Sequence, residues 1–77
     1  MDNIQVKNEI IGTVYAETRS GALIRSDELP PETVCFCPGC FTIGDKALFT
    51  IQKYTYLEDK IKILLSYDSM IEYAYAA

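Results

Sequence analysis

Residues 46–56 read KALFTIQKYTY, and this stretch decides the fold class that we expect for the chain. Ala47, Phe49 and Ile51 fall on one face of an extended chain, and mainly polar side chains fall on the other. A period of two in hydrophobicity is typical of a β-strand with one face packed on a core. The stretch therefore predicts a half-buried strand of about eleven residues.

The same alternation recurs in four shorter segments, which are residues 9–17, 22–26, 33–36 and 61–66. Turn residues separate them, in TRSG at 18–21, DELPPET at 27–33, PG at 38–39 and LEDK at 57–60. Five short strands in one domain spanning residues 1–77 predict an all-β protein, a small five-stranded antiparallel barrel. The OB-fold is the best-known barrel of this size, and an SH3-like barrel is the alternative.

The C-terminal residues SMIEYAYAA, 69–77, carry a helix signal instead of a strand signal. Ser69 and Glu72 have the spacing of a capping box, in which the two side chains satisfy backbone N–H groups at a helix start. We therefore expect a short C-terminal helical tail after the fifth strand.

Composition narrows the classes of function. The chain of 77 residues has no histidine, a net charge of −4 and 49% hydrophobic residues. It contains no phosphate-binding glycine loop, no nucleophile elbow and no Ser/His or Cys/His pair, so we expect a protein that is not an enzyme. No stretch has the apolar length of a spanning helix, and no signal-peptide pattern opens the sequence, so we expect a cytoplasmic protein with no membrane partner.

Short sequence elements follow one another in a fixed order along residues 9–66. They are GTV at 12–14, GALI at 21–24, CFCP at 35–38, IGD at 43–45 and KILLS at 62–66. This succession resembles the S1-type RNA-binding domain, whose usual pattern runs G-x-V, F-G-A-F-V, G-F-[IV]-[PH]-x-S, x-G-D-x-V and R-I-x-L-S. Bacterial translation initiation factor one is a close relative of that family with the same shape. The resemblance implies an OB-fold that binds single-stranded RNA.

The resemblance also implies where the RNA would lie. The family's binding face is built from the second and third strands, and the loops between strands one and two and between strands four and five flank it. The family's two strand-2 aromatic positions fall here on Ser20 and Leu23, and its strand-3 histidine falls on Pro38. Its strand-5 arginine falls on Lys62, and a nearby aspartate corresponds to Glu58. One cation is thus kept, whereas the stacking platform is changed.

The candidate RNA-binding residues combine cations for phosphates with apolar groups for bases. They are Arg19, Leu23, Arg25, Phe36, Lys60 and Lys62. Tyr15 and the tyrosines of KYTY are the aromatic side chains that would compensate for the changed platform.

Three cysteines lie within six residues, CFCPGC at 35–40. A structural zinc site needs four ligands, whereas Cys35, Cys37 and Cys40 supply three, with Asp45 as the only near carboxylate. Our main interpretation is that the thiols are structural and that the protein has no cofactor, since free cysteine behaves as a small hydrophobe. A zinc site in one chain, or one shared across a dimer, is the alternative. The context of a redox motif is missing.

Three functions follow from these observations. The first is weak binding of single-stranded RNA, alone or within a ribonucleoprotein such as the ribosome. The second is a protein-binding adaptor on the same fold, which the acidic balance and the tyrosine-rich C-terminal part favour. The third is a cysteine-rich zinc-binding structural protein. A free strand edge and the tyrosines also allow a homodimer.

Overall fold

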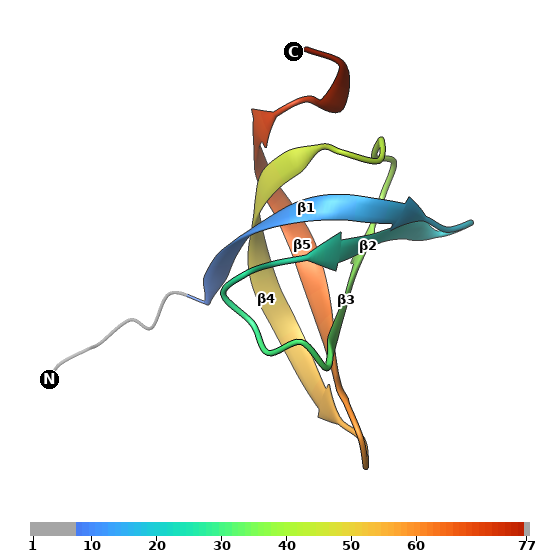
Figure 1. Cartoon of the computed structure of the whole chain (residues 1–77), viewed down its shortest axis with the longest axis vertical. Coiled ribbons are helices and arrows are strands. Elements are labelled where there is room, and N and C mark those ends of the chain that lie inside the picture. Colours follow the sequence, from blue (N-terminus) through green and yellow to red (C-terminus); the bar gives the residue numbers. More distant parts are fainter. Residues whose placement is uncertain (1–7, 77) are drawn as a thin grey trace, which may run out of the picture.

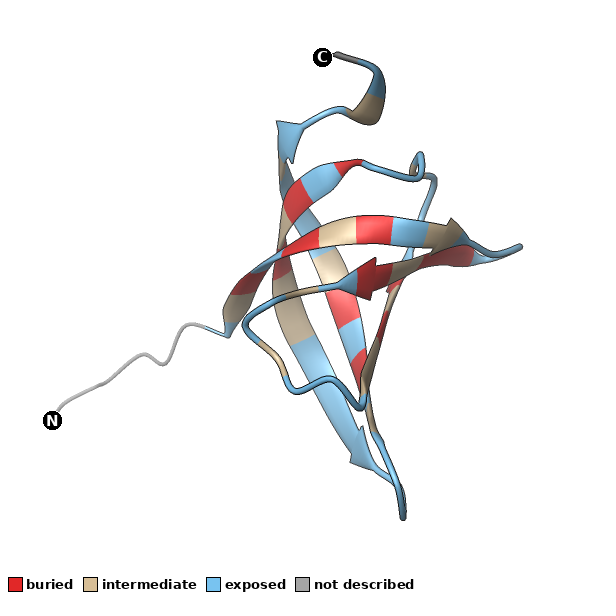
Figure 2. Ribbon diagram, viewed as in Figure 1, coloured by how far each residue is buried: buried red, intermediate tan, exposed pale blue. Residues whose placement is uncertain are grey.

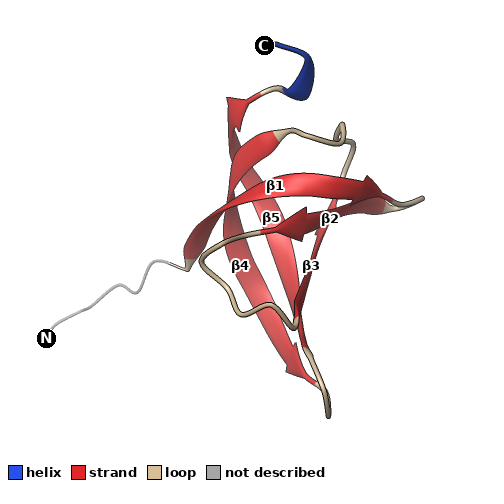
Figure 3. Cartoon of the chain, in the orientation of Figure 1, coloured by secondary structure: helices blue, strands red, loops and turns tan. Residues whose placement is uncertain are grey.

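The computed structural model describes residues 8–76, which form one small barrel (Figure 1). Its strands are β1 (Glu9–Glu17), β2 (Gly21–Arg25), β3 (Thr33–Pro38), β4 (Lys46–Tyr56) and β5 (Ile61–Glu72). One 3-10 turn, η1 (Ala74–Ala76), follows β5, and the described residues contain no α-helix (Figure 3). The prediction of an all-β chain with five strands is confirmed. Nowhere in residues 8–76 is there a helix with the length and hydropathy to cross a membrane.

The strands close into a barrel in the order β1-β2-β3-β5-β4, consistent with an OB-like fold. The prediction of a purely antiparallel barrel is wrong, because β3 and β5 run parallel, with Thr33 paired to Ile61 and Phe36 to Leu64. The reason is geometric. Strand directions cannot alternate at every contact around a closed ring with an odd number of strands. At least one parallel contact is therefore required.

The helical tail is also a wrong prediction over most of its length. Residues 69–72 continue β5, and Ser69 pairs with Leu48 while Glu72 pairs with Lys46. The long β4 strand offers a ladder of backbone partners to this segment, and that ladder outcompetes the local capping signal. Only the turn Ala74–Ala76 is helical, and residue 77 lies outside the described residues.

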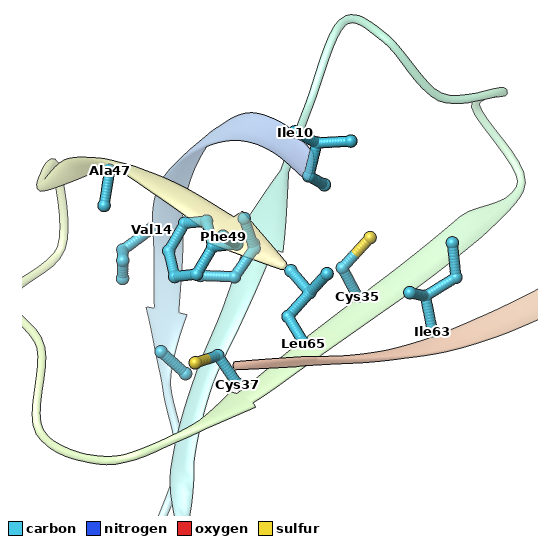
Figure 4. Close-up of a cluster of buried hydrophobic side chains, with 10 residues drawn as sticks. Ile10, Val14, Cys35, Cys37, Ala47, Phe49, Ile63 and Leu65 are labelled. Atoms are coloured by element: carbon cyan, nitrogen blue, oxygen red, sulfur yellow. The ribbon is translucent and has the colours of Figure 1, made fainter. Parts of the chain in front are cut away.

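The core lies along the barrel axis and contains ten buried apolar side chains, with the ring of Phe49 among them (Figures 2 and 4). Every strand contributes alternate residues, as the sequence pattern predicts. The exception is Ala16, which the pattern places on the core face of the first strand. A bulge between Val14 and Ala16 shifts the register, so Ala16 is only half-buried.

Asp45 is a buried carboxylate that ties three segments of the fold together. Its Oδ2 accepts a hydrogen bond from Thr42 N at 3.0 Å, and its Oδ1 accepts one from Ala74 N at 2.8 Å. Its carbonyl oxygen accepts from Val14 N at 2.9 Å. The aspartate of the IGD element is therefore an internal anchor for the β3–β4 loop and the C-terminal turn.

The β4–β5 hairpin extends beyond the rest of the barrel (Figure 1). Within the described residues, β1 pairs with β4 only from Lys46 to Thr50, whereas β4 pairs with β5 as far as Tyr56. The hairpin end therefore has neighbours on fewer sides than the middle of the barrel.

Candidate nucleic-acid interface

An apolar row crosses the outside of three neighbouring strands. Leu23 on β2 pairs with Phe36 on β3, and Phe36 pairs with Leu64 on β5. Their neighbours along each strand point into the core, so these three side chains point outward. Leu64 is 39% exposed, and the other two are half-buried. An exposed apolar row on the outside of a barrel has no role in its core.

The ring of Phe36 rests on Gly21, which lies diagonally across the β2–β3 pair. A Cβ atom built on Gly21 would lie 2.7 Å from Phe36 Cζ and 2.3 Å from the carbonyl oxygen of Cys37. A side chain at this position would collide with the ring and with the backbone unless one of them moved. The glycine of the GALI element therefore fixes the position of the outward phenylalanine, a relation that the sequence analysis missed.

A row of cations runs beside the apolar row. Thr13 on β1 pairs with Arg25 on one side and with Lys46 on the other, and Lys62 on β5 pairs with Val34 and Thr55. Arg25 directly follows Ile24, the last β2 residue that pairs with β3, and Lys62 pairs with Val34 on the other side of β3. Arg25 and Lys62 are sequence-predicted residues, and the structure places them in this row.

Lys53 is an exposed cation of the same surface that the sequence analysis missed. It pairs with Leu64 at the end of the apolar row, whereas Lys46 lies beyond β1, opposite Glu72 at the other end of β4. Lys53 belongs to no family element, and a register shift between Ile51 and Lys53 places it opposite Leu64. We name the apolar row and these cations together the outer face; its residues are Leu23, Arg25, Val34, Phe36, Lys53, Lys62 and Leu64.

The guanidinium of Arg25 lies over the ring of Tyr15, with 5.1 Å between its Cζ and the ring centroid. Tyr15 is the residue inserted at the β1 bulge, and it is 41% exposed. A cation–π contact holds the long arginine side chain in one place and leaves its other N–H groups for a ligand. The bulge therefore adds an aromatic group at one end of the outer face.

The two remaining predicted cations lie in turns. Arg19 belongs to the β1–β2 turn, where Thr18 Oγ1 accepts a hydrogen bond from Gly21 N at 3.0 Å. Lys60 belongs to the β4–β5 turn, beside the acidic pair Glu58 and Asp59. The two turns lie at separate corners of the barrel (Figure 1). The structure therefore brings Leu23, Arg25, Phe36 and Lys62 onto one face and leaves Arg19 and Lys60 at its periphery.

The three cysteines do not gather into one site. Cys35 and Cys37 are buried in the core (Figure 4), and Cys40 is exposed. Burial raises the pKa of both core thiols, because the thiolate loses its hydration. Residues 8–76 contain no group of three or more His, Cys, Asp or Glu side chains that is placed to hold a metal ion.

Four of the six tyrosines form two separate stacked pairs. Tyr54 and Tyr56 stack on the projecting hairpin with 6.2 Å between ring centroids, and Tyr73 and Tyr75 stack near the C-terminal turn at 5.8 Å. Both pairs are well exposed. Tyr54 and Tyr56 come from the strand face that is continuous with the core, whereas Lys53 and Thr55, which alternate with them, belong to the outer side.

In comparisons with known proteins, no family model, no curated protein and no solved structure matches the chain.

Proposed function

We propose that this protein binds single-stranded RNA weakly on the outer face, in the manner of an S1-like OB-fold module. The observation that carries the proposal is the side-by-side course of the two rows. Leu23, Phe36 and Leu64 provide an apolar surface, and Arg25 and Lys62 flank it. In single-strand binding, bases stack on apolar and aromatic groups while cations follow the phosphates.

Weak affinity follows from the composition of this face. Phe36 is the aromatic group on it, Tyr15 lies at one end beneath Arg25, and each stacked base contributes about 1–3 kcal/mol. The chain has a net charge of −4, and acidic residues lie in both loops beside the cations, at Asp27, Glu28 and Glu58. Long-range attraction to a polyanion is therefore small, and binding depends on local contacts and on low salt. A ribonucleoprotein surface, which holds RNA at high local concentration, suits such a module.

The test is fluorescence anisotropy with a labelled, unstructured RNA decamer at low salt. Arg25→Gln and Lys62→Gln should each weaken binding, and each should lower the slope of log K against log[salt] by about 0.7, because one phosphate contact is lost. Ser69→Glu is the matched control. It changes the net charge by the same amount and lies on the same strand as Lys62, about 23 Å away along β5.

Three results would contradict the proposal. One is the absence of any salt-dependent binding. The second is equal binding by the wild type and by both glutamine variants. The third is equal weakening by the control, which would attribute the effect to net charge and not to the outer face.

The second candidate function is a protein-binding adaptor, which the two exposed tyrosine stacks favour. Tyrosine is enriched in protein interfaces because it is rigid and amphipathic. Affinity capture from lysate, with and without nuclease, separates the two functions. Recovery of partners that resists nuclease and is lost in Tyr54→Ser or Tyr73→Ser supports the adaptor, whereas nuclease-sensitive recovery supports RNA binding.

A further inference from the structure

A cavity of about 530 Å³ opens where β3 and β5 diverge, beyond their last pairing at Phe36 and Leu64. The loop after β3 forms one part of its lining, the end of β5 a second part, and the C-terminal turn a third. None of the outer-face residues lines this cavity, so it is a separate candidate site.

Four aromatic rings contribute to the lining, and they come as two pairs. Phe41 and Tyr67 contact each other with 5.7 Å between ring centroids, and their planes are tilted by 59°. Tyr73 and Tyr75 are the stacked pair near the C-terminal turn. The faces of aromatic rings carry partial negative charge, so rings that gather around one cavity favour a cation.

One carboxylate holds the backbone that carries both ring pairs. Asp45 Oδ2 accepts the hydrogen bond from Thr42 N, and Thr42 directly follows Phe41. Asp45 Oδ1 accepts the hydrogen bond from Ala74 N, and Ala74 lies between the two stacked tyrosines. The fold's own hydrogen bonds therefore position the rings, which lowers the entropic cost of binding a ligand between them.

The charges around the cavity have one sign. Asp45 lines it but is only 4% exposed, so its carboxylate acts on a ligand through its charge and not through direct contact. That attraction is stronger at the low-dielectric edge of the core than it would be in water. No lysine or arginine of residues 8–76 lines the cavity, whereas Asp68 and Glu72 are exposed neighbours of lining residues along the chain. The cavity is therefore complementary to a positive group.

The lining also restricts the kind of cation. A lysine ammonium group is strongly hydrated and carries three N–H donors that need acceptors when it leaves water. Both oxygens of Asp45 already accept backbone hydrogen bonds, and the ring faces are poor substitutes for water. A trimethylammonium group has no N–H donor and carries its charge on an apolar surface, so the rings and the thioether of Met70 can surround it. The choline group of a lipid is less suitable, because the lining has no cation for the phosphate beside it.

We propose that this cavity binds a trimethylated lysine side chain of a protein partner, with the rings of Phe41, Tyr67, Tyr73 and Tyr75 around the cation. The inference goes beyond RNA binding and is independent of it, because the cavity shares no residue with the outer face.

The experiment titrates three short, glycine-flanked peptides into the isotope-labelled protein at fixed salt, followed by amide NMR spectra. Their central residue is trimethyllysine, lysine, or the uncharged tert-butyl analogue in which carbon replaces the nitrogen. The trimethyllysine peptide should shift the amide signals of Phe41, Thr42, Met70 and Ala74. It should bind about 10-fold tighter than the other two peptides, which is the effect of a desolvated cation–π contact.

Variants of one ring test the role of its face. Tyr73→Leu keeps an apolar side chain but removes the ring, and should weaken binding of the trimethyllysine peptide about 3- to 10-fold. Tyr73→Phe should keep the affinity, because the ring face and not the hydroxyl meets the cation. Tyr54→Leu is the matched control, since it removes a ring from the other stacked pair, and it should change nothing. Tyr73 is 47% exposed, so thermal unfolding should show melting temperatures close to that of the wild type.

Several outcomes would overturn the proposal. Equal binding of the tert-butyl peptide would show an apolar cavity without preference for a cation, and equal binding of the lysine peptide would show attraction by charge alone. An unchanged affinity in Tyr73→Leu, equal weakening in Tyr54→Leu, or no binding of the trimethyllysine peptide would also overturn it. None of these results bears on RNA binding, which the anisotropy assay tests separately.

Discussion

The inward and outward sides of β3 differ in their burial and in what their side chains contact. Cys35 and Cys37 point inward and are at most 2% exposed, whereas Val34 and Phe36 point outward and are half-buried. The inward pair fills small volumes beside Phe49 and Leu65, for which a thiol is as suitable as another small apolar group. The outward pair lies between the partner strands β2 and β5, where it contributes to a surface. Cys35 and Cys37 therefore contribute to the core, whereas Val34 and Phe36, which alternate with them, are the candidates for function.

Removing an aromatic ring from each side is the strongest test of this difference. Phe49→Ala should lower the free energy of unfolding by about 3–5 kcal/mol, because it leaves a cavity in the middle of the core. Phe36→Ala should cost roughly 1 kcal/mol but should abolish most RNA binding. Urea unfolding measures the two losses of stability, and fluorescence anisotropy measures RNA binding. Phe49→Leu replaces Phe49→Ala if the alanine variant does not fold. Comparable losses of stability in the two alanine variants would refute the assignment of Phe36 to a surface.

Gly21→Ala should lower both the stability of the barrel and its affinity for RNA. The new Cβ would lie 2.3 Å from the carbonyl oxygen of Cys37 and 2.7 Å from the ring of Phe36. We expect a loss of about 1–3 kcal/mol from the forced backbone shift, together with weaker RNA binding because the ring is displaced. Combining Gly21→Ala with Phe36→Ala relieves the contact with the ring only, so the two losses should be less than additive. Full additivity would mean that the ring does not rest on the glycine.

Alkaline pH should lower the free energy of unfolding through the two buried thiols of β3. The pKa of Cys35 and of Cys37 is raised above the ordinary value of 9.0 by burial, so the unfolded chain releases these protons first. Their contribution is complete below pH 9 and falls as the pH rises from there through the folded pKa values. Urea midpoints measured from pH 8 to 10.5 should fall less steeply for Cys35→Ala/Cys37→Ala than for the wild type. Parallel slopes would show that the thiols do not contribute.

Cys40 should give the smallest effect. It is exposed in the loop after β3, so Cys40→Ser should change stability by less than about 0.5 kcal/mol. An aromatic disulfide reagent at neutral pH should titrate one thiol rapidly in the native wild type and none in the variant. Rapid reaction of two or three native thiols would show that the inward cysteines are accessible.

Local patterns in the sequence predict the strands and most of their faces correctly. Ala22, Ile24, Ala47 and Phe49 lie on the buried sides that alternation indicates. The failures have a common cause, which is that long-range pairing overrides a local signal. The bulge after Val14 and the strand conformation of Ser69 depend on partners in β2 and β4.

The candidate site is predictable to the extent that family elements mark it. Phe36 and Lys62 could be named from those elements and Arg25 from its place on the second strand, and the structure places all three on one face. Lys53 could not, because a register shift between Ile51 and Lys53 determines that it lies opposite Leu64.

The parallel contact between β3 and β5 also has a consequence for the order of folding. The β1–β2 and β4–β5 hairpins join neighbouring segments and can form early, as local contacts do. The parallel contact joins Thr33 to Ile61, and the β1–β4 contact joins Glu9 to Thr50, so each requires a long loop to close first. We therefore expect the two hairpins to assemble before the ring closes, which makes closure the slow step. The outer face crosses the parallel contact, so it exists only once that last step is complete.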